Sequence, residues 1–274
     1  MVRSLAVAVV LSCFAASAGA QVQLAPAVQA APAKPDIKKP APKTKAAAKP
    51  TAPANVGPCK YGIITATEDI FTVQKIGLTV FGNEYAEVPV SWGFDDLIYA
   101  RTRAAAGAIA VRRITYAKGT FASYYHPKSS LFRNARQELA DLVRQIAGNA
   151  GCERYLVVTR LEAQLQGTNQ TLNGIGVLNR GVGFINHSWL FAYVSVIVLD
   201  GQTFEIRKDP NANFEAVLAR IAANLTKNES MRDVDNSAFP VSPAEAATSA
   251  ILRDGARAFL TERLDKFLPA YFKD

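Results

Sequence analysis

The stretch SWLFAYVSVIVL, residues 188–199, decides the fold. Its alternate residues form two apolar sets: Trp189, Phe191, Tyr193 and Ile197 on one side, and Leu190, Ala192, Val194, Val196 and Val198 on the other. A strand that is apolar on both sides is covered on both faces, so the stretch predicts a central strand between layers of other elements. The Asp200-Gly201 pair that follows it is a hairpin signal and predicts a return strand over residues 202–207.

Further elements are predicted on either side of this strand. Shorter strands are expected over residues 61–65, 70–76, 78–81, 110–116 and 154–163. Helices are expected over residues 97–108, over 130–150 with Ser130 as the cap, over 214–225, and from a capping box at residues 242–245 to near the C-terminus. This order predicts an α/β (α+β) fold, with a single mixed sheet covered by amphipathic helices in one domain, residues 59–274.

The segment between two predicted strands, residues 167–183, is rich in glycine and asparagine. Its glycines match neither a phosphate-binding loop nor a dinucleotide fingerprint. We expect a long hairpin loop here, because a rigid sheet can present such a loop to a partner. The residues predicted to contact that partner are Asn173, Ile175, Val177, Leu178, Arg180 and Val182. A mobile hairpin without a partner is the alternative.

The first 58 residues differ from the rest of the chain. Arg3, an apolar run and an Ala-x-Ala site before Gln21 predict a secretory signal peptide over residues 1–20. A core helix is one alternative, and a lipid anchor at Cys13 is another, because residues 10–13 resemble the box before a lipidated cysteine. Residues 21–58 repeat alanine, proline and lysine, and this composition predicts a disordered, extended tether.

The net charge of +8 resides mainly in that tether, which carries six lysines against one aspartate. From Cys59 onward there are 24 basic and 22 acidic residues, so the charge does not indicate nucleic-acid binding. The lysines either contact anionic lipid or wall polymer weakly, or keep the spacer soluble. No later apolar run is long enough to span a membrane, so no transmembrane span is expected after signal cleavage.

Two cysteines, Cys59 and Cys152, remain once the signal peptide is removed. In an oxidising compartment an even pair predicts a disulfide, although two free buried thiols are the alternative. These cysteines and the two histidines lack the spacing of metal ligands, so no metal and no cofactor are expected.

The two histidines, His126 and His187, are the candidates for acid–base chemistry. Neither lies in a motif that supplies a nucleophile: there is no Gly-x-Ser-x-Gly, Ser-x-x-Lys or His-Glu-x-x-His in the sequence. We therefore expect a protein that is not an enzyme. The alternative is a periplasmic enzyme of unrecognised type that uses one of these histidines with a nearby carboxylate.

The order of predicted elements resembles the periplasmic α/β domains of the TolB amino-terminal, CsgG-like and LpoB-like group. The resemblance rests on an opening strand and helix, a second helix and strand (154–163), a long loop, a strand that ends in Leu199-Asp200-Gly201, and a closing amphipathic helix. It implies a non-catalytic component of the cell envelope that docks other proteins. The resemblance transfers no functional residue. From the sequence itself we expect an exported module that contacts an envelope partner through the loop at 167–183 and the sheet edge. A tethering protein that binds anionic polymer or lipid through its lysines remains an alternative.

Overall fold

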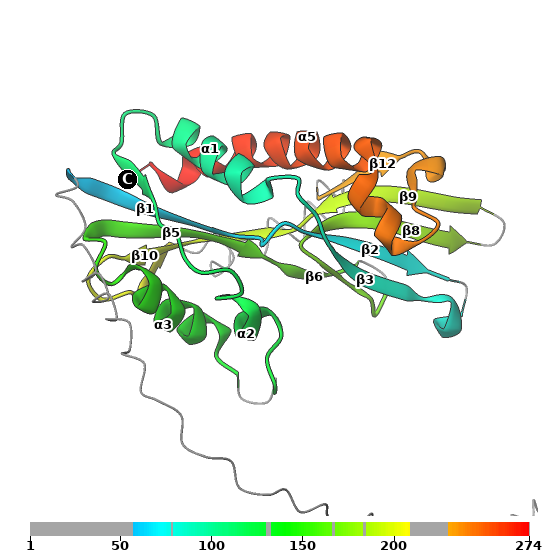
Figure 1. Ribbon diagram of the computed structural model, residues 1–274, viewed down its shortest axis with the longest axis horizontal. Helices are drawn as coiled ribbons and strands as arrows, with labels where there is room; N and C mark the ends of the chain where they lie inside the picture. The colour runs from blue at the N-terminus through cyan, green and yellow to red at the C-terminus, as the bar shows by residue number, and fades with distance from the viewer. Residues whose placement is uncertain are drawn as a thin grey trace, which may run out of the picture. The chain divides into compact units, whose positions relative to one another are not determined.

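The stretch at residues 188–199 belongs to two consecutive strands, β9 (Ile185–Ala192) and β10 (Val194–Asp200), in the computed structural model of the protein (Figure 1). The structure describes residues 57–77, 79–129, 133–165, 168–182, 185–208 and 230–273. These residues belong to one compact unit, Pro53–Asp274. The predicted signal peptide, Cys13, the tether up to residue 56 and the helix predicted over 214–225 lie outside the described residues.

The described strands form two five-stranded sheets and one short ribbon. Sheet A has the order β11 (Ile206–Lys208), β10, β5 (Cys152–Arg160), β1 (Cys59–Ala66) and β4 (Val111–Arg113). Sheet B has the order β12 (Met231–Val234), β9, β8 (Ile175–Val182), β2 (Ile70–Ile76) and β3 (Glu84–Pro89). The ribbon pairs β6 (Glu162–Gln164) with β7 (Thr171–Asn173). The predicted α+β class is confirmed, whereas the prediction of a single sheet is wrong.

Two segments of chain run from one sheet into the other. β1 of sheet A is followed after residues 67–69 by β2 of sheet B, and β9 of sheet B is followed after Tyr193 by β10 of sheet A. Pairing is parallel for β1 with β4 and β5, and for β2 with β8. The other described pairs are antiparallel. The two sheets are therefore joined by continuous backbone at two places.

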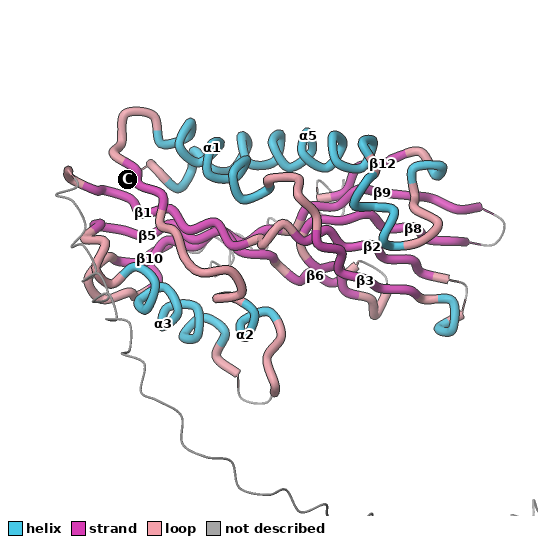
Figure 2. Tube along the Cα trace, in the orientation of Figure 1, coloured by secondary structure: helices cyan, strands magenta, loops and turns pink. Residues whose placement is uncertain are grey.

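Helices cover both faces of sheet A (Figures 1 and 2). α1 (Phe94–Ala106) lies on one face, and α2 (Ala122–Tyr125) and α3 (Ala135–Ala147) lie on the other. α5 (Ala250–Phe267) lies on the same side as α1, against which it packs, and it covers β8 and β9 of sheet B. Four short 3₁₀ segments complete the described helices: η1 (Val80–Gly82), η2 (Asn236–Ala238), η3 (Pro243–Thr248) and η4 (Leu268–Tyr271). The helix predicted to begin at residue 243 is divided, because Ser249 is extended and its hydroxyl caps α5 at the amide of Leu252 (3.3 Å).

The two apolar sets of residues 188–199 enter different cores, as predicted. Leu190, Ala192, Val196 and Val198 pack in the core that also holds the buried face of α5. On the opposite side, Ile197 packs with α3, and Phe191 packs with residues of the β6–β7 ribbon. The stretch is therefore covered on both faces, as predicted, but the prediction of one central strand is wrong, because the stretch divides at Tyr193 into strands of two sheets.

A disulfide joins Cys59 to Cys152, as predicted. The two residues are direct neighbours in the β1–β5 ladder, and their Cα atoms are 4.6 Å apart. The bond therefore connects the first residues of two adjacent parallel strands.

The turn between β1 and β2 and the N-terminus of α1 hold each other in place. The carboxylate of Asp69 accepts hydrogen bonds from the amides of Gly93 (3.1 Å) and Phe94 (2.5 Å) at the start of the helix. In return, Asp95 of α1 accepts from the amide and the hydroxyl of Thr67, both at 2.9 Å. Burial is the main cause that raises the pKa of Asp95, and the hydrogen bonds from Thr67 oppose it. These contacts fix the point at which the chain leaves sheet A for sheet B.

Candidate functional site

Arg160, the last residue of β5, is buried where sheet A meets sheet B. Its side chain is 1% exposed, and its guanidinium lies over the ring of Tyr125, 4.0 Å from the ring centroid. Nη1 lies 3.0 Å from Oε1 of Glu87, and Nη2 lies 4.0 Å from Oε2 of Glu68. Nε of Arg160 and Oε1 of Glu68 have no hydrogen-bond partner among the described residues. A buried cation between two carboxylates thus forms the centre of a polar cluster.

Glu87 of the edge strand β3 collects contacts from several elements. Its Oε1 accepts hydrogen bonds from the hydroxyl of Tyr85 (2.9 Å) and from Nδ2 of Asn173 in β7 (3.3 Å). Its Oε2 lies 3.6 Å from Nε2 of His126, the residue that follows α2. The side chain of Glu87 is still 17% exposed, so the cluster opens to solvent at this carboxylate.

The turn that carries Glu68 has an unusual backbone. Glu68 and Asp69 have φ angles of 61° and 47°, a left-handed conformation that is uncommon for residues other than glycine. The hydrogen bonds to Asp69 and Asp95 hold this conformation. It places the Glu68 carboxylate beside Arg160, and strained backbone of this kind is concentrated at functional sites in proteins.

Tyr125 ties the cluster to α2. Its hydroxyl donates a hydrogen bond to the carbonyl of Ala66 at the end of β1 and accepts one from the amide of Arg160 (3.0 Å). Burial is the main cause that raises the pKa of Tyr125. The side chain of Tyr125 therefore links the ends of β1 and β5 to α2, the helix that His126 directly follows.

The cluster carries two carboxylates against one guanidinium, so it has a formal charge of −1 when His126 is neutral. No group of three or more His, Cys, Asp or Glu side chains among the described residues is arranged to hold a metal ion. The arrangement instead offers a partly exposed carboxylate to a cationic or hydrogen-bonding group. We refer to Glu68, Tyr85, Glu87, His126, Arg160 and Asn173 as the junction cluster.

The second histidine lies elsewhere. His187 is exposed on β9, opposite Arg180 of β8, and stacks on Trp189 with ring centroids 5.6 Å apart. Of the two histidines considered for acid–base chemistry, His126 is the one that the structure places beside a carboxylate.

The prediction that residues 167–183 form a long loop is wrong for the described part of this segment. The described part of this segment forms β7 and β8, and β8 lies in the middle of sheet B. Gly176 is required by close packing, because a Cβ atom there would come within 2.2 Å of the Thr72 carbonyl oxygen and 2.4 Å of the Phe191 ring. The glycine that suggested a loop is thus a point of close approach within the sheet.

The residues predicted to contact a partner are separated by this arrangement. Ile175, Val177 and Leu178 are buried in the hydrophobic cores and are not available to a partner. Arg180 is half-buried on β8, and Val182 is the last residue of that strand. Only Asn173 belongs to the junction cluster, through its hydrogen bond to Glu87.

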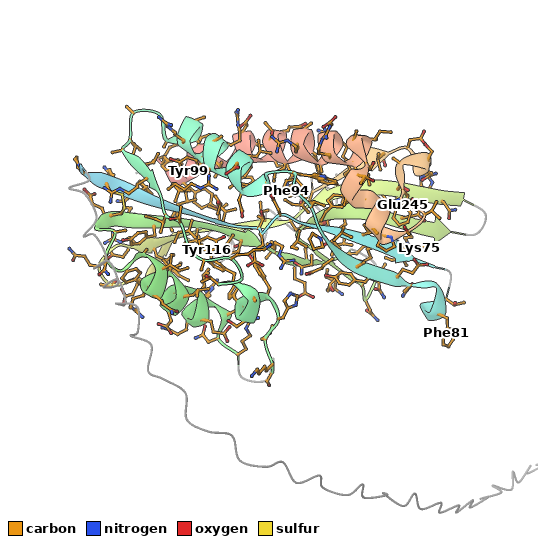
Figure 3. The ribbon with its side chains drawn as sticks, viewed as in Figure 1. Lys75, Phe81, Phe94, Tyr99, Tyr116 and Glu245 are labelled. Atoms are coloured by element: carbon orange, nitrogen blue, oxygen red, sulfur yellow. A yellow bond between two sulfur atoms is a disulfide. The ribbon has the colours of Figure 1, made fainter. Side chains whose placement is uncertain are left out.

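The β2–β3 turn, which precedes β3 in the chain, carries a second feature. The turn between β2 and β3 contains η1, and Phe81 at its tip is 96% exposed (Figure 3). The turn is closed by a hydrogen bond from the amide of Gly77 to Oδ1 of Asn83 (3.0 Å), and a Cβ atom on Gly77 would come within 2.8 Å of the Gly82 Cα. The hydrogen bond between Gly77 and Asn83 thus closes the base of the turn from which Phe81 projects.

Sequence reasoning missed most of the junction cluster. β3 was not predicted, and with it Tyr85 and Glu87 were missed. One signal was available: Arg160 ends a run of apolar and threonine residues, and a charged residue at the end of a buried strand calls for a charged partner. The carboxylate that pairs with Arg160 depends on the turn at Glu68, and no local sequence pattern predicts that turn.

The phenol of Tyr85 provides a test of the cluster in solution. Burial, the hydrogen bond to Glu87 and the charge of Glu87 raise the pKa of Tyr85 from its ordinary value of 10.0 to about 12. Because the folded protein holds this proton more tightly than the unfolded chain, the stabilisation is present below pH 10 and is lost as the pH rises towards 12.

We expect the tyrosinate absorbance of wild type minus that of Tyr85→Phe to give a titration midpoint near 12. Tyr99→Phe serves as a control for the loss of one phenol at a site outside the cluster. A difference midpoint near 10 would show that Tyr85 does not contact Glu87 in solution.

Two further observations concern membrane-spanning helices and similarity to known proteins. Among the described residues, no helix is both long and apolar enough to cross a membrane. No protein-family model, curated protein or solved structure matches the chain significantly.

Proposed function

We propose that the protein is an exported, non-catalytic binding or assembly module of the cell envelope, and that it docks a partner protein at the β2–β3 hairpin of sheet B. Export is supported by the disulfide between Cys59 and Cys152, since such bonds persist in oxidising compartments. The sequence analysis expected the partner to bind both at residues 167–183 and at a sheet edge. We now propose that it binds at the sheet edge alone.

The observation that carries the docking proposal is the exposure of two aromatic side chains on one hairpin. Four large apolar side chains are exposed among the described residues, and two of them, Phe81 and Tyr85, belong to the β2–β3 hairpin. Exposed aromatic residues that are held by an ordered scaffold are typical anchors of protein interfaces.

Site-specific photo-crosslinking in the envelope of the producing organism tests this proposal. A benzophenone amino acid at position 81 of the full chain is expected to give a covalent adduct with a protein of discrete mass. Ile251 is the matched control position, because it is also exposed (66%) but lies on α5. The proposal is wrong if position 81 gives no adduct, or gives the same adducts as position 251.

One contact favours the alternative of an exported enzyme. Nε2 of His126 lies 3.6 Å from the Glu87 carboxylate, slightly beyond hydrogen-bond distance. A carboxylate that comes within hydrogen-bond reach of a histidine can orient it as a base. His126→Ala separates the two functions: as a binding module the protein keeps its adduct at position 81 and its cellular phenotype, whereas an enzyme that uses His126 loses its phenotype.

A further inference from the structure

The outer edge of β3 has backbone groups that pair with no other described strand. The amide of Val90 donates a hydrogen bond to the carbonyl of Asp69 (2.8 Å), and the β2–β3 register continues this pairing to Lys75 and Glu84. In an antiparallel ladder, hydrogen-bonded and non-hydrogen-bonded pairs alternate. Val88 and Ala86 therefore bond to β2, while Tyr85 and Glu87 direct their N–H and C=O groups away from the sheet.

Pro89 agrees with this assignment. It occupies the next outward-facing position along β3, where a residue without an N–H group interrupts no ladder bond. Among the described residues, no other strand pairs with the outer side of β3. At six residues, β3 is also longer than the other edge strands β4, β11 and β12, which have three, three and four residues. Over the part of the chain that the structure describes, it is the longest edge strand of either sheet, and so the longest edge for an added strand.

The side chains beside this edge favour a basic partner. The backbone N–H and C=O groups of Glu87 point away from the sheet, and its carboxylate pairs with Arg160, the one buried cationic residue among those described. The carboxylate of Glu68 lies 4.0 Å from the same guanidinium and has one oxygen without a hydrogen-bond partner among the described residues. A lysine or arginine that enters beside Glu87 would balance the second carboxylate.

We propose that β3 binds its partner by strand addition, and that the added segment is extended and carries a lysine or arginine side chain facing Glu87. This inference rests on the proposed function, because it states how the partner of the β2–β3 hairpin is bound. Hydrogen bonds to Tyr85 and Glu87 would supply affinity, and the junction cluster would select the basic side chain.

Two substitutions at one position test the backbone contribution. Tyr85→Pro removes both the ring and the outward N–H, whereas Tyr85→Ser removes the ring and keeps the N–H. With the photo-crosslinker at position 81, we expect the adduct yield of Tyr85→Pro to be about fivefold or more below that of Tyr85→Ser. Equal yields would overturn strand addition while leaving the docking proposal intact, and absence of the adduct in the parent chain would overturn the docking proposal itself.

Amide hydrogen exchange gives a second measurement that does not depend on how the proline variant folds. In the full chain alone, the amides of Tyr85 and Glu87 should exchange rapidly, while those of Ala86 and Val88 are protected by β2. In the purified adduct, exchange at positions 85 and 87 should slow by about tenfold or more. Unchanged exchange at these two positions would overturn strand addition.

The basic side chain is tested by Glu87→Gln, which keeps the size of the residue and removes its charge. We expect the adduct yield to fall at low ionic strength, and the difference from the parent chain to shrink as salt is added. If the Glu87→Gln yield equals that of the parent chain at low salt, the requirement for a lysine or arginine is wrong.

Discussion

The double variant Cys59→Ala/Cys152→Ala is expected to lose about 4–5 kcal/mol of its free energy of unfolding. The disulfide closes a loop between residues 93 positions apart, and the entropy that it removes from the unfolded chain grows with the length of that loop. Both cysteines are buried, and their backbones already face each other in the β1–β5 ladder. The bond therefore restricts the unfolded chain without requiring the strands to move.

Urea unfolding of the purified protein, followed by tryptophan fluorescence, measures this loss. Wild type with its disulfide reduced should unfold within about 1 kcal/mol of the double variant, because both lack the same constraint. This comparison separates the bond from the packing of the two sulfur atoms. If the double variant and the reduced wild type both lie within about 1 kcal/mol of the oxidised wild type, the stabilising role of the bond is disproved.

Arg160→Met is expected to destabilise the protein by about 3–5 kcal/mol. The variant leaves the carboxylates of Glu68 and Glu87 without their shared cation, and an uncompensated buried charge is far more costly than a lost surface pair. Methionine fills much of the space of the arginine stem, so the expected loss is mainly electrostatic.

Two further variants test whether the loss of stability in Arg160→Met is electrostatic. Arg101→Met removes an exposed pair with Asp265, and we expect it to cost less than about 1 kcal/mol. Combining Arg160→Met with Glu68→Gln and Glu87→Gln should recover most of the lost stability, because the buried charges are then gone. If Arg160→Met costs no more than Arg101→Met, the junction cluster is not a charged cluster in solution.

Strong local patterns predicted much of the central fold. The two apolar faces of residues 188–199 gave the strands of β9 and β10, and the paired cysteines gave the disulfide. The helix predicted over residues 97–108 corresponds to α1, which begins three residues earlier, at Phe94. Each of these signals lies in the residues themselves and needs no knowledge of distant contacts.

Elements that depend on pairing could not be predicted in this way. β3 contains two glutamates and a proline among its six residues, a composition typical of an exposed edge, and it is a strand because β2 pairs with it. A strand was predicted over residues 78–81, and its described residues, 79–81, lie instead in the turn that contains η1. The strand predicted over 110–116 is reduced to β4, three residues long.

The junction cluster could be predicted from local sequence patterns even less than β3 could. Its members come from β3, β5, β7, the β1–β2 turn and the end of α2, and the contact between Arg160 and Glu87 spans two sheets. No periodicity relates these positions. The left-handed turn at Glu68 and Asp69 brings them together, and that turn is stabilised by α1, which lies more than twenty residues further along the chain.

The bond between Cys59 and Cys152 also affects how the fold withstands mechanical load. Tension on the residues before Gly57 reaches the fold at the first residue of β1, and the sulfur bridge passes it directly to the first residue of β5. Peeling these strands apart from that end would require rupture of a covalent bond. If a partner is bound to β3 and the residues before Gly57 are anchored, force between these two points passes through β1 and β5 together. The disulfide prevents β1 from separating alone at its first residue.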